Sequence, residues 1–221
     1  ARRSGRFSLA SVLLALYCAP IVFLCVNTVF ASLKSRGELA QSFFGFPAAP
    51  TFENYRVVLI DEQFLRYFGN SVVLTFCSLA ALLLVSSMLA YGLAWYDFKG
   101  KGLWELFFLL GMMFPIQLGI LPNFIALRQL NLLNRLSGLV LLYTANLSLS
   151  CFIFSKHFKT LPRAIYESAK IDGAGEFAIF ARIMLPLSKP VIGTIALVSG
   201  VNILNDFYMP MVFLTKAETR T

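Results

Sequence analysis

The sequence predicts an all-α polytopic membrane protein. Of its 221 residues, 58% are hydrophobic and only 14% are charged, and the mean hydropathy is +0.74. A soluble domain of this size needs a larger polar surface. Five long apolar stretches recur along the chain, without the alternation of apolar and polar residues that a membrane barrel requires. A bundle of transmembrane helices is therefore expected.

The five stretches are predicted to be spans within a single domain covering residues 1–221. They lie at about 9–33, 70–96, 103–127, 136–155 and 190–214. A helix of about 20 residues, rising about 1.5 Å per residue, crosses a hydrocarbon core of about 30 Å. Pro20 and Pro115 fit this interpretation because neighbouring helices can satisfy the backbone groups that proline frees.

The connections between the spans differ in length and composition. Residues 34–69 form a long polar stretch, predicted to be an ordered loop with a short helix opening at Thr51–Tyr55. Residues 97–102 form a tight turn, residues 129–131 a short one, and residues 156–189 the longest segment on the side of that tight turn. Each span therefore runs antiparallel to the next.

Basic residues orient this arrangement. With the amino terminus in the cytoplasm, eleven Lys and Arg residues fall in inside segments and eight in outside segments. The bias grows when only short loops near the spans are weighed. We predict a cytoplasmic amino terminus, and the net charge of +8 then reflects membrane topology rather than binding to nucleic acid.

The inside segment at about 157–188 is predicted to be a helix-turn-helix. Pro162 suits the first turn of a helix, and Gly173 suits a left-handed residue that closes it. A second helix ends at Pro186. It is expected to place four apolar residues on one face, at Phe177, Phe180, Ala181 and Met184.

The first of these two helices has the composition of a docking surface. It is expected to expose small residues that let a partner approach closely, at Ser168, Ala169, Gly173 and Ala174. Glu167 and Asp172 lie beside them and can fix the partner's orientation. From these residues alone, an amphipathic hairpin that only joins two spans is an equal alternative.

The spacing of this segment closely resembles the Glu-Ala-Ala loop of permease subunits of bacterial ABC importers. The matching run is Glu167-Ser168-Ala169, two residues, Asp172-Gly173-Ala174, five residues, Phe180, two residues, Ile183, one residue, Leu185-Pro186. Ser168 stands where the family usually has Ala. Three further runs are similar to the maltose-type carbohydrate permeases: Met112–Gln117, Leu185–Pro190 and Asn205–Phe207.

The resemblance implies a multi-pass protein of the bacterial inner membrane with six spans, the sixth beyond Thr221. It implies four partners: a second homologous permease, a dimeric ATP-binding subunit, an extracytoplasmic solute-binding protein and the bilayer. The first helix of the loop would seat in the ATPase, so ATP and Mg belong to that partner and this chain needs no cofactor. The cargo implied is a sugar or oligosaccharide, with a sugar-phosphate or another polar solute as the alternative.

Polar residues within the spans are candidates for the translocation path, because such groups tend to face a bundle interior or a water-filled route. In the last span, Ser199, Asn202, Asp206, Met209 and Phe213 are predicted to share a helical face, with Asn205 beside it. Tyr143 and Asn146 lie on the fourth span, and Gln117 follows an expected kink at Pro115. Solvation of Asp206 near the outer interface, and asparagines that only join helices, are equal alternatives.

Catalytic and metal sites are not indicated. The single histidine, His157, has no second ligand or nucleophile near it in the sequence, and the chain lacks a phosphate-binding GxxxxGK[ST] motif. An ion-coupled secondary transporter would favour several membrane carboxylates and internal repeats, whereas only Asp206 is available. We therefore expect a non-catalytic subunit that takes its energy from a partner.

Overall fold

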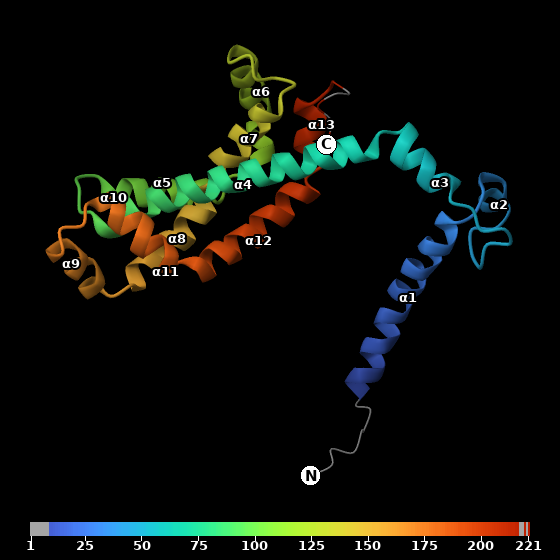
Figure 1. Cartoon of the computed structure of the whole chain (residues 1–221), viewed down its shortest axis with the longest axis horizontal. Helices are drawn as coiled ribbons and strands as arrows, with labels where there is room; N and C mark the ends of the chain where they lie inside the picture. Colours follow the sequence, from blue (N-terminus) through green and yellow to red (C-terminus); the bar gives the residue numbers. More distant parts are fainter. Residues whose placement is uncertain (1–8, 217–218, 220) are drawn as a thin grey trace, which may run out of the picture. The chain divides into compact units, whose positions relative to one another are not determined.

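The computed structural model describes residues 9–216, 219 and 221, and in these residues it contains helices and no strand (Figure 1). The elements, in chain order, are α1 (Leu9–Ser32), α2 (Arg36–Gln41), α3 (Glu53–Arg56), a π-helix η1 (Val57–Asp61), α4 (Phe64–Trp95), α5 (Lys101–Gly111), a 3-10 helix η2 (Ile116–Gly119), α6 (Ile120–Gln129), α7 (Leu136–Ala145), α8 (Ser148–Thr160), α9 (Arg163–Ile171), α10 (Glu176–Ile179), a π-helix η3 (Phe180–Met184), α11 (Leu185–Leu187), α12 (Lys189–Asn205) and α13 (Tyr208–Phe213). The all-helical fold class is confirmed.

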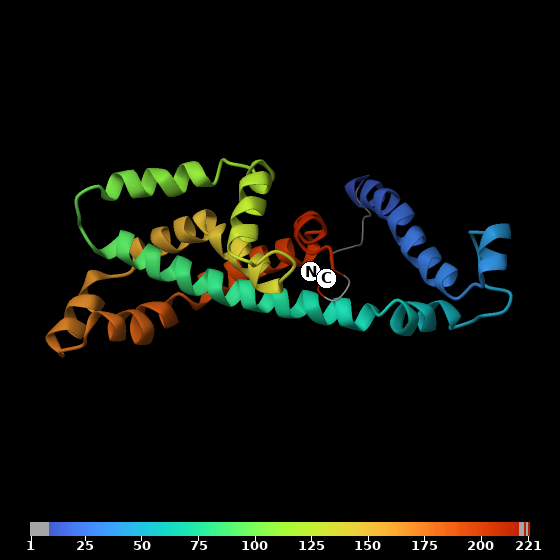
Figure 2. The same cartoon turned by 90° about the horizontal axis from the view of Figure 1, so that it is seen from above.

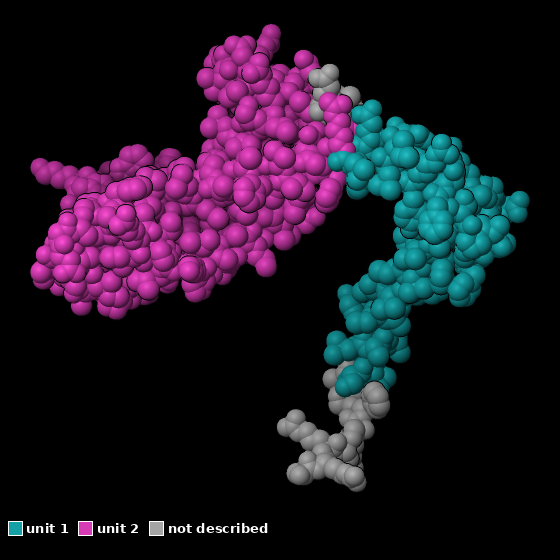
Figure 3. All heavy atoms as spheres, viewed as in Figure 1, with its two compact units in different colours: residues 1–65 teal, residues 66–221 magenta. Residues whose placement is uncertain are grey.

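The chain divides into two compact units, residues 1–65 and residues 66–221 (Figure 3). The first unit carries α1, a helix that is apolar on all sides, as expected of a membrane span. Its bounds match the first predicted stretch. The organisation of the whole chain as one domain stays a prediction.

A compact loop follows α1 in the first unit, built around the buried side chain of Lys34. Its ammonium group donates hydrogen bonds to the carbonyl oxygens of Ser42, at 3.0 Å, and Phe44, at 3.1 Å. Asn54, in the predicted short helix, donates to the carbonyl oxygens of Ser32 and Lys34 at 3.0 and 2.7 Å. These side chains satisfy backbone carbonyls that no strand or helix would pair, which keeps the loop folded.

The second unit is organised along α4. Five of the buried residues of α4 lie four positions apart and form one stripe: Leu74, Ser78, Leu82, Ser86 and Ala90. Small residues in such a stripe let neighbouring helices approach closely. On an adjacent face, a Cβ built on Gly200 of α12 would lie 3.7 Å from the side chain of Leu79. Figure 2 shows α8 beside α4 and α5 on the far side of α8.

Two apolar clusters fill this unit, one near each end of α4. The cluster near its start contains Leu74, Leu127, Leu139, Tyr143, Ile203, Met209, Phe213 and Leu214. The cluster near its end joins α4 to α8, to residues 169–184 and to α12, through Ala90, Tyr91, Leu93, Cys151, Phe154, Phe158, Ala169, Ile179, Phe180, Met184 and Ile195. Residues 157–188 therefore contribute side chains to the packed core and are not a peripheral loop.

Three of the predicted spans are interrupted helices. The segment at 103–127 breaks at Pro115, which has no N–H to donate and favours an extended residue before it. The segment at 136–155 bends by 47° between α7 and α8, and the segment at 190–214 breaks between α12 and α13. By contrast, α1 runs through Pro20 without a break.

In the described residues, two helices are long and apolar enough to cross a membrane, Ser11–Ser32 and Phe64–Trp95. Two bent pairs add further candidates: α7 with α8, and Glu176–Leu187 with α12, which meet at 73°. The structure thus offers two to four candidate spans, and the second begins at Phe64 rather than near residue 70. Five spans with a sixth beyond Thr221 stays a prediction.

Candidate functional site: a helical hairpin anchored to α4

The hairpin at residues 162–187 has the predicted turn. Pro162 precedes α9, and Gly173 follows its end with a φ of 77°. The Gly173 N–H donates to the Lys170 carbonyl and the Ala174 N–H donates to the Ala169 carbonyl, both at 3.0 Å. This paired arrangement is the Schellman motif, which satisfies the last carbonyl groups of a helix. The prediction that Gly173 closes the first helix in a left-handed conformation is confirmed.

The outward side of α9 presents most of the predicted docking residues. Glu167, Ser168, Asp172 and Gly173 are exposed, and Ala174 is half-buried. Ala169 is only 6% exposed and packs into the cluster at the end of α4. The expectation that Ala169 is exposed was therefore wrong, because α9 needs one small residue on its inner face to lie close to the core.

The second helix of the hairpin departs from the predicted pattern in two ways. Pro186 does not end it, since the helix continues through Leu187. Phe177 is 72% exposed, whereas Ile179, Phe180 and Met184 are buried. The π-helix at Phe180–Met184 is the reason for the second difference. A π-turn holds more residues than an α-turn, so the apolar face does not follow the spacing of 3, 4 and 7.

The two helices of the hairpin and the end of α4 meet at Glu176, a residue that the sequence reasoning missed. Glu176 pairs with Lys170 of α9 and accepts hydrogen bonds from the hydroxyl groups of Tyr166, at 2.8 Å, and Tyr91, at 3.2 Å. Tyr91 lies 85 positions earlier, in α4. The sequence feature that points to Glu176 is its position at the start of a predicted helix, six residues after Lys170.

These donors hold the Glu176 carboxylate in its charged form. Hydrogen bonds from Lys170, Tyr96, Tyr166 and Tyr91 lower the pKa of Glu176 to about 2. The pKa of Lys170 is raised in turn, mainly by its hydrogen bond to Glu176. The pKa of Tyr166 is raised by burial and by the same carboxylate. Glu176 and Lys170 therefore both stay charged throughout the physiological pH range.

Two of the predicted path residues come together at the break in the last apolar stretch. The Tyr143 hydroxyl donates to the Asp206 carboxylate at 3.0 Å. The other carboxylate oxygen of Asp206 accepts from the N–H groups of Tyr208, at 2.9 Å, and Met209, at 3.1 Å. Asp206 thus caps the start of α13. The predicted continuous stripe through Ser199, Asn202, Asp206, Met209 and Phe213 is wrong, because the helix ends at Asn205 and restarts at Tyr208.

The other predicted path residues are exposed, and one of them, Asn205, shares a cavity with Asp206. Gln117, Asn146, Asn202 and Asn205 all have exposed side chains. Asn205 and Asp206 line the same cavity of about 160 Å³ at the start of α4. Asn146 lies at the bend between α7 and α8, beside a separate cavity of about 400 Å³.

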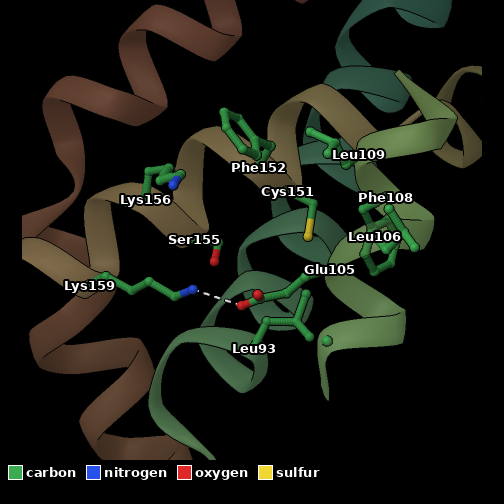
Figure 4. Close-up of a pocket in the computed structure, with 11 residues that line it drawn as sticks. Leu93, Glu105, Leu106, Phe108, Leu109, Cys151, Phe152, Ser155, Lys156 and Lys159 are labelled. Atoms are coloured by element: carbon green, nitrogen blue, oxygen red, sulfur yellow. Dashed lines mark hydrogen bonds and ion pairs between the residues drawn. The ribbon is translucent and has the colours of Figure 1, made fainter. Parts of the chain in front are cut away.

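A further groove, of about 320 Å³, lies between α5 and α8 (Figure 4). Its walls are mostly apolar, and an ion pair closes one end, where the Lys159 ammonium lies 2.7 Å from the Glu105 carboxylate. Each of these two side chains is 41% exposed, so the pair contributes little to stability. No sequence pattern predicts this contact, which joins residues 54 positions apart.

The described residues offer little that could form a metal or catalytic site. Among the described residues, no group of three or more His, Cys, Asp and Glu side chains could hold a metal ion. The His157 ring is tilted by 46° to the Phe158 ring, with centroids 6.3 Å apart, and its buried Nε2 has no hydrogen-bond partner among the described residues. The hairpin and its anchor are the best-defined polar feature of the second unit.

Comparisons with known proteins identify a family and several relatives of this chain. Residues 82–218 match the family model "Binding-protein-dependent transport system inner membrane component". The chain is 34% identical to the diacetylchitobiose uptake system permease protein NgcG of Streptomyces coelicolor, over 96% of this chain and 70% of the relative. It is 32% identical to the arabinooligosaccharides transport system permease protein AraQ of Bacillus subtilis, over 100% of this chain and 81% of the relative.

A solved structure shows the same fold. A chain from the crystal structure of a bacterial ABC transporter involved in the import of the acidic polysaccharide alginate superposes with a TM-score of 0.84 and 23% identity, covering 98% of this chain and 79% of that chain.

Proposed function

Because this chain belongs to the family of binding-protein-dependent transport system inner membrane components, we propose that it is the permease subunit of an ABC importer for a sugar or oligosaccharide. It is a multi-pass protein of the inner membrane. The relatives described above are named for diacetylchitobiose and arabinooligosaccharides, which supports a carbohydrate as the cargo. A sugar-phosphate or another polar solute is the alternative.

The observation that carries the proposal is the exposed side of α9. Glu167, Ser168, Asp172 and Gly173 face outward there, while Ala169 and Ala174 hold the helix against the core. A partner ATPase would dock on this side, with Glu167 and Asp172 supplying polar contacts and Ser168 and Gly173 allowing close approach. Closure of the ATPase on ATP would then favour one state of the permease over another, as a population shift requires.

The remaining assignments follow from the family. This chain would be non-catalytic, with ATP and Mg on the dimeric ATPase. A second homologous permease would form the other half of the translocation path, and an extracytoplasmic binding protein would deliver the solute. The amino terminus would lie in the cytoplasm, so that the hairpin faces the ATPase.

The translocation path is proposed to pass the polar groups near the helix breaks. Asn205 and Asp206 line one cavity and Asn146 lines another, which gives amide and carboxylate groups that can bind hydroxyl groups. The side chains of Gln117 and Asn202 are exposed when this chain is considered without its partner subunits. Tyr143 would act indirectly, by orienting Asp206.

Uptake by membrane vesicles that contain the full complex tests the energy source. ATP is supplied inside, the binding protein is added outside, and ionophores collapse the ion gradients. We expect uptake to persist under these conditions. Loss of uptake with ATP present would instead favour an ion-coupled secondary transporter.

The cargo is tested with the binding protein that serves this permease. Its retention of neutral mono- and oligosaccharides is compared with its retention of sugar-phosphates. We expect a neutral saccharide to be retained and then imported. Retention of only a phosphorylated sugar would overturn the carbohydrate assignment while leaving the ABC permease assignment intact.

A further inference from the structure

The contact between the hairpin and the end of α4 is more extensive than a connecting loop requires. Polar and aromatic side chains from both partners converge there. The Trp95 ring stacks on the Tyr166 ring, with centroids 5.0 Å apart and planes at 27°. Tyr91 packs against Phe180, with centroids 5.3 Å apart. α4 therefore meets both helices of the hairpin.

The hairpin needs this contact because its helices are too short to be stable alone. α9 has nine residues and the second helix, from Glu176 to Leu187, has twelve, and isolated helices of up to about 12–15 residues are marginal in water. A force applied to the outer side of α9 would tilt the hairpin unless its inner side is fixed. The position of α9 is thus set by what holds its inner side.

Apolar packing and the Glu176 cluster fix that inner side in different ways. Burial of Ala169 and Ile179 is non-directional, so packed helices can still slide past one another. The Glu176 carboxylate instead binds Lys170 and Tyr166 of α9 through one oxygen and Tyr91 of α4 through the other. Hydrogen bonds to a charged acceptor are stronger and more directional than neutral ones. This cluster ties three helices at one point.

We infer that Glu176 is a positioning residue for energy coupling: its carboxylate locks the hairpin to the end of α4, so that a displacement of α9 by the ATPase moves α4. This inference rests on the proposed docking of an ATPase at α9. It goes further by naming the route through which movement enters the membrane unit. Glu167 and Asp172 would receive the ATPase, and Glu176 would pass the movement on.

The test uses the full transporter, purified and reconstituted in vesicles with its binding protein. Glu176→Gln keeps the shape of the side chain and removes its charge. Tyr91→Phe with Tyr96→Phe removes the donors at the α4 end and leaves the pairing inside the hairpin. Tyr208→Phe, at an exposed tyrosine of α13, is the matched control.

Three quantities are measured for each variant: the amount of ATPase that co-purifies, the rate of ATP hydrolysis, and the number of ATP molecules hydrolysed per solute imported. We expect co-purification to be unchanged for Glu176→Gln and for the double tyrosine variant. The ATP cost of each import event should rise by about two- to thirty-fold, the range found for mutations in coupling networks. The Tyr208→Phe control should match the wild type.

Two outcomes would overturn the inference. One is an unchanged ATP cost per import in both variants, which would show that apolar packing alone transmits the movement. The other is a parallel loss of co-purifying ATPase and of uptake, which would give Glu176 a merely structural role. Failure of the proposed function looks different, because then no ATPase would co-purify with the wild-type chain.

Discussion

Substitution of Gly173 tests whether α9 docks on a partner or only joins two membrane segments. Gly173 has a φ of 77°, and a Cβ built on it meets no atom within 4 Å. Crowding inside this chain therefore adds nothing to the cost of a side chain there. The remaining cost is the left-handed backbone, about 1–2 kcal/mol for a residue with a Cβ.

That cost sets the size of the effect that the chain alone can produce. At about 1.4 kcal/mol for each factor of ten, Gly173→Ala would lower the population of the closed turn by roughly five- to thirty-fold relative to its open forms. Gly173→Asn should cost less, because asparagine tolerates this region. Gly173→Trp carries a similar backbone cost to Ala, and its indole projects into the open space where a partner would lie.

The assay is ATP-driven uptake in vesicles, with the amount of permease in the membrane measured in parallel. We expect uptake to be abolished by Gly173→Trp and partly retained by Ala and Asn, with equal membrane levels. Gly100→Trp is the matched control, since Gly100 also has a positive φ and no atom near its Cβ but lies outside the hairpin. Normal uptake by Gly173→Trp, or equal loss in Ala and Trp, would refute the docking argument.

Three further predictions concern other polar groups. Lys34→Met should open the loop of the first unit, because it removes the Lys34 donor from the carbonyl oxygens of Ser42 and Phe44 and leaves only the Ser42 hydroxyl to donate to the Phe44 carbonyl. A buried acceptor left without a donor costs about 1–3 kcal/mol. Faster proteolysis within residues 34–52 would show the opening, and unchanged protection would contradict it. Asp206→Ala should lower uptake more than Asp206→Asn, because asparagine can still cap α13, whereas loss of a cap costs about 1 kcal/mol. An equal loss of uptake in the two variants would mean that the charge of Asp206 matters rather than its capping of the helix. Since the pKa of Glu176 is lowered to about 2, its stabilisation of the hairpin is complete above its unfolded pKa of about 4.3 and is lost as the pH falls toward 2. Protection of residues 162–187 from hydrogen exchange should therefore be constant from about pH 8 to pH 5 and fall below about pH 4, and Glu176→Gln should remove that fall.

Local features of the hairpin could be predicted from the sequence because their causes are local. A glycine after a helical pattern predicts the left-handed residue, and Gly173 adopts it. The short helix near Thr51–Tyr55 is likewise confirmed as α3. Each depends on residues within one or two turns of the chain.

Helix breaks could not be predicted from hydropathy, because an apolar stretch has the same composition whether or not its backbone is continuous. Pro20 lies inside an unbroken helix, whereas Pro115 lies at an interruption. The break at Asp206 depends on its side chain accepting from two N–H groups of the next helix. The outcome at each site is decided by which groups can satisfy the freed backbone.

Long-range contacts were equally inaccessible from the sequence. Glu176 matters because Tyr91, 85 positions away, reaches it across the packed unit. Glu105 and Lys159 likewise pair only because the fold brings α5 and α8 side by side. No periodicity in the sequence encodes which turn of one helix lies beside which turn of another.

The π-helix at Phe180–Met184 has a consequence for the length of the hairpin. Ile179 and Met184 are both fully buried although they are five residues apart, and on a regular α-helix such residues point about 140° away from each other. A π-turn is an α-helix that has taken in one additional residue. Deleting one residue here would convert the π-turn to an ordinary α-turn and leave Met184 in the core, whereas inserting another would turn Met184 out of the core and shift every later side chain around the helix. The segment between Gly173 and Ser188 should therefore tolerate the loss of one residue more readily than the gain of one.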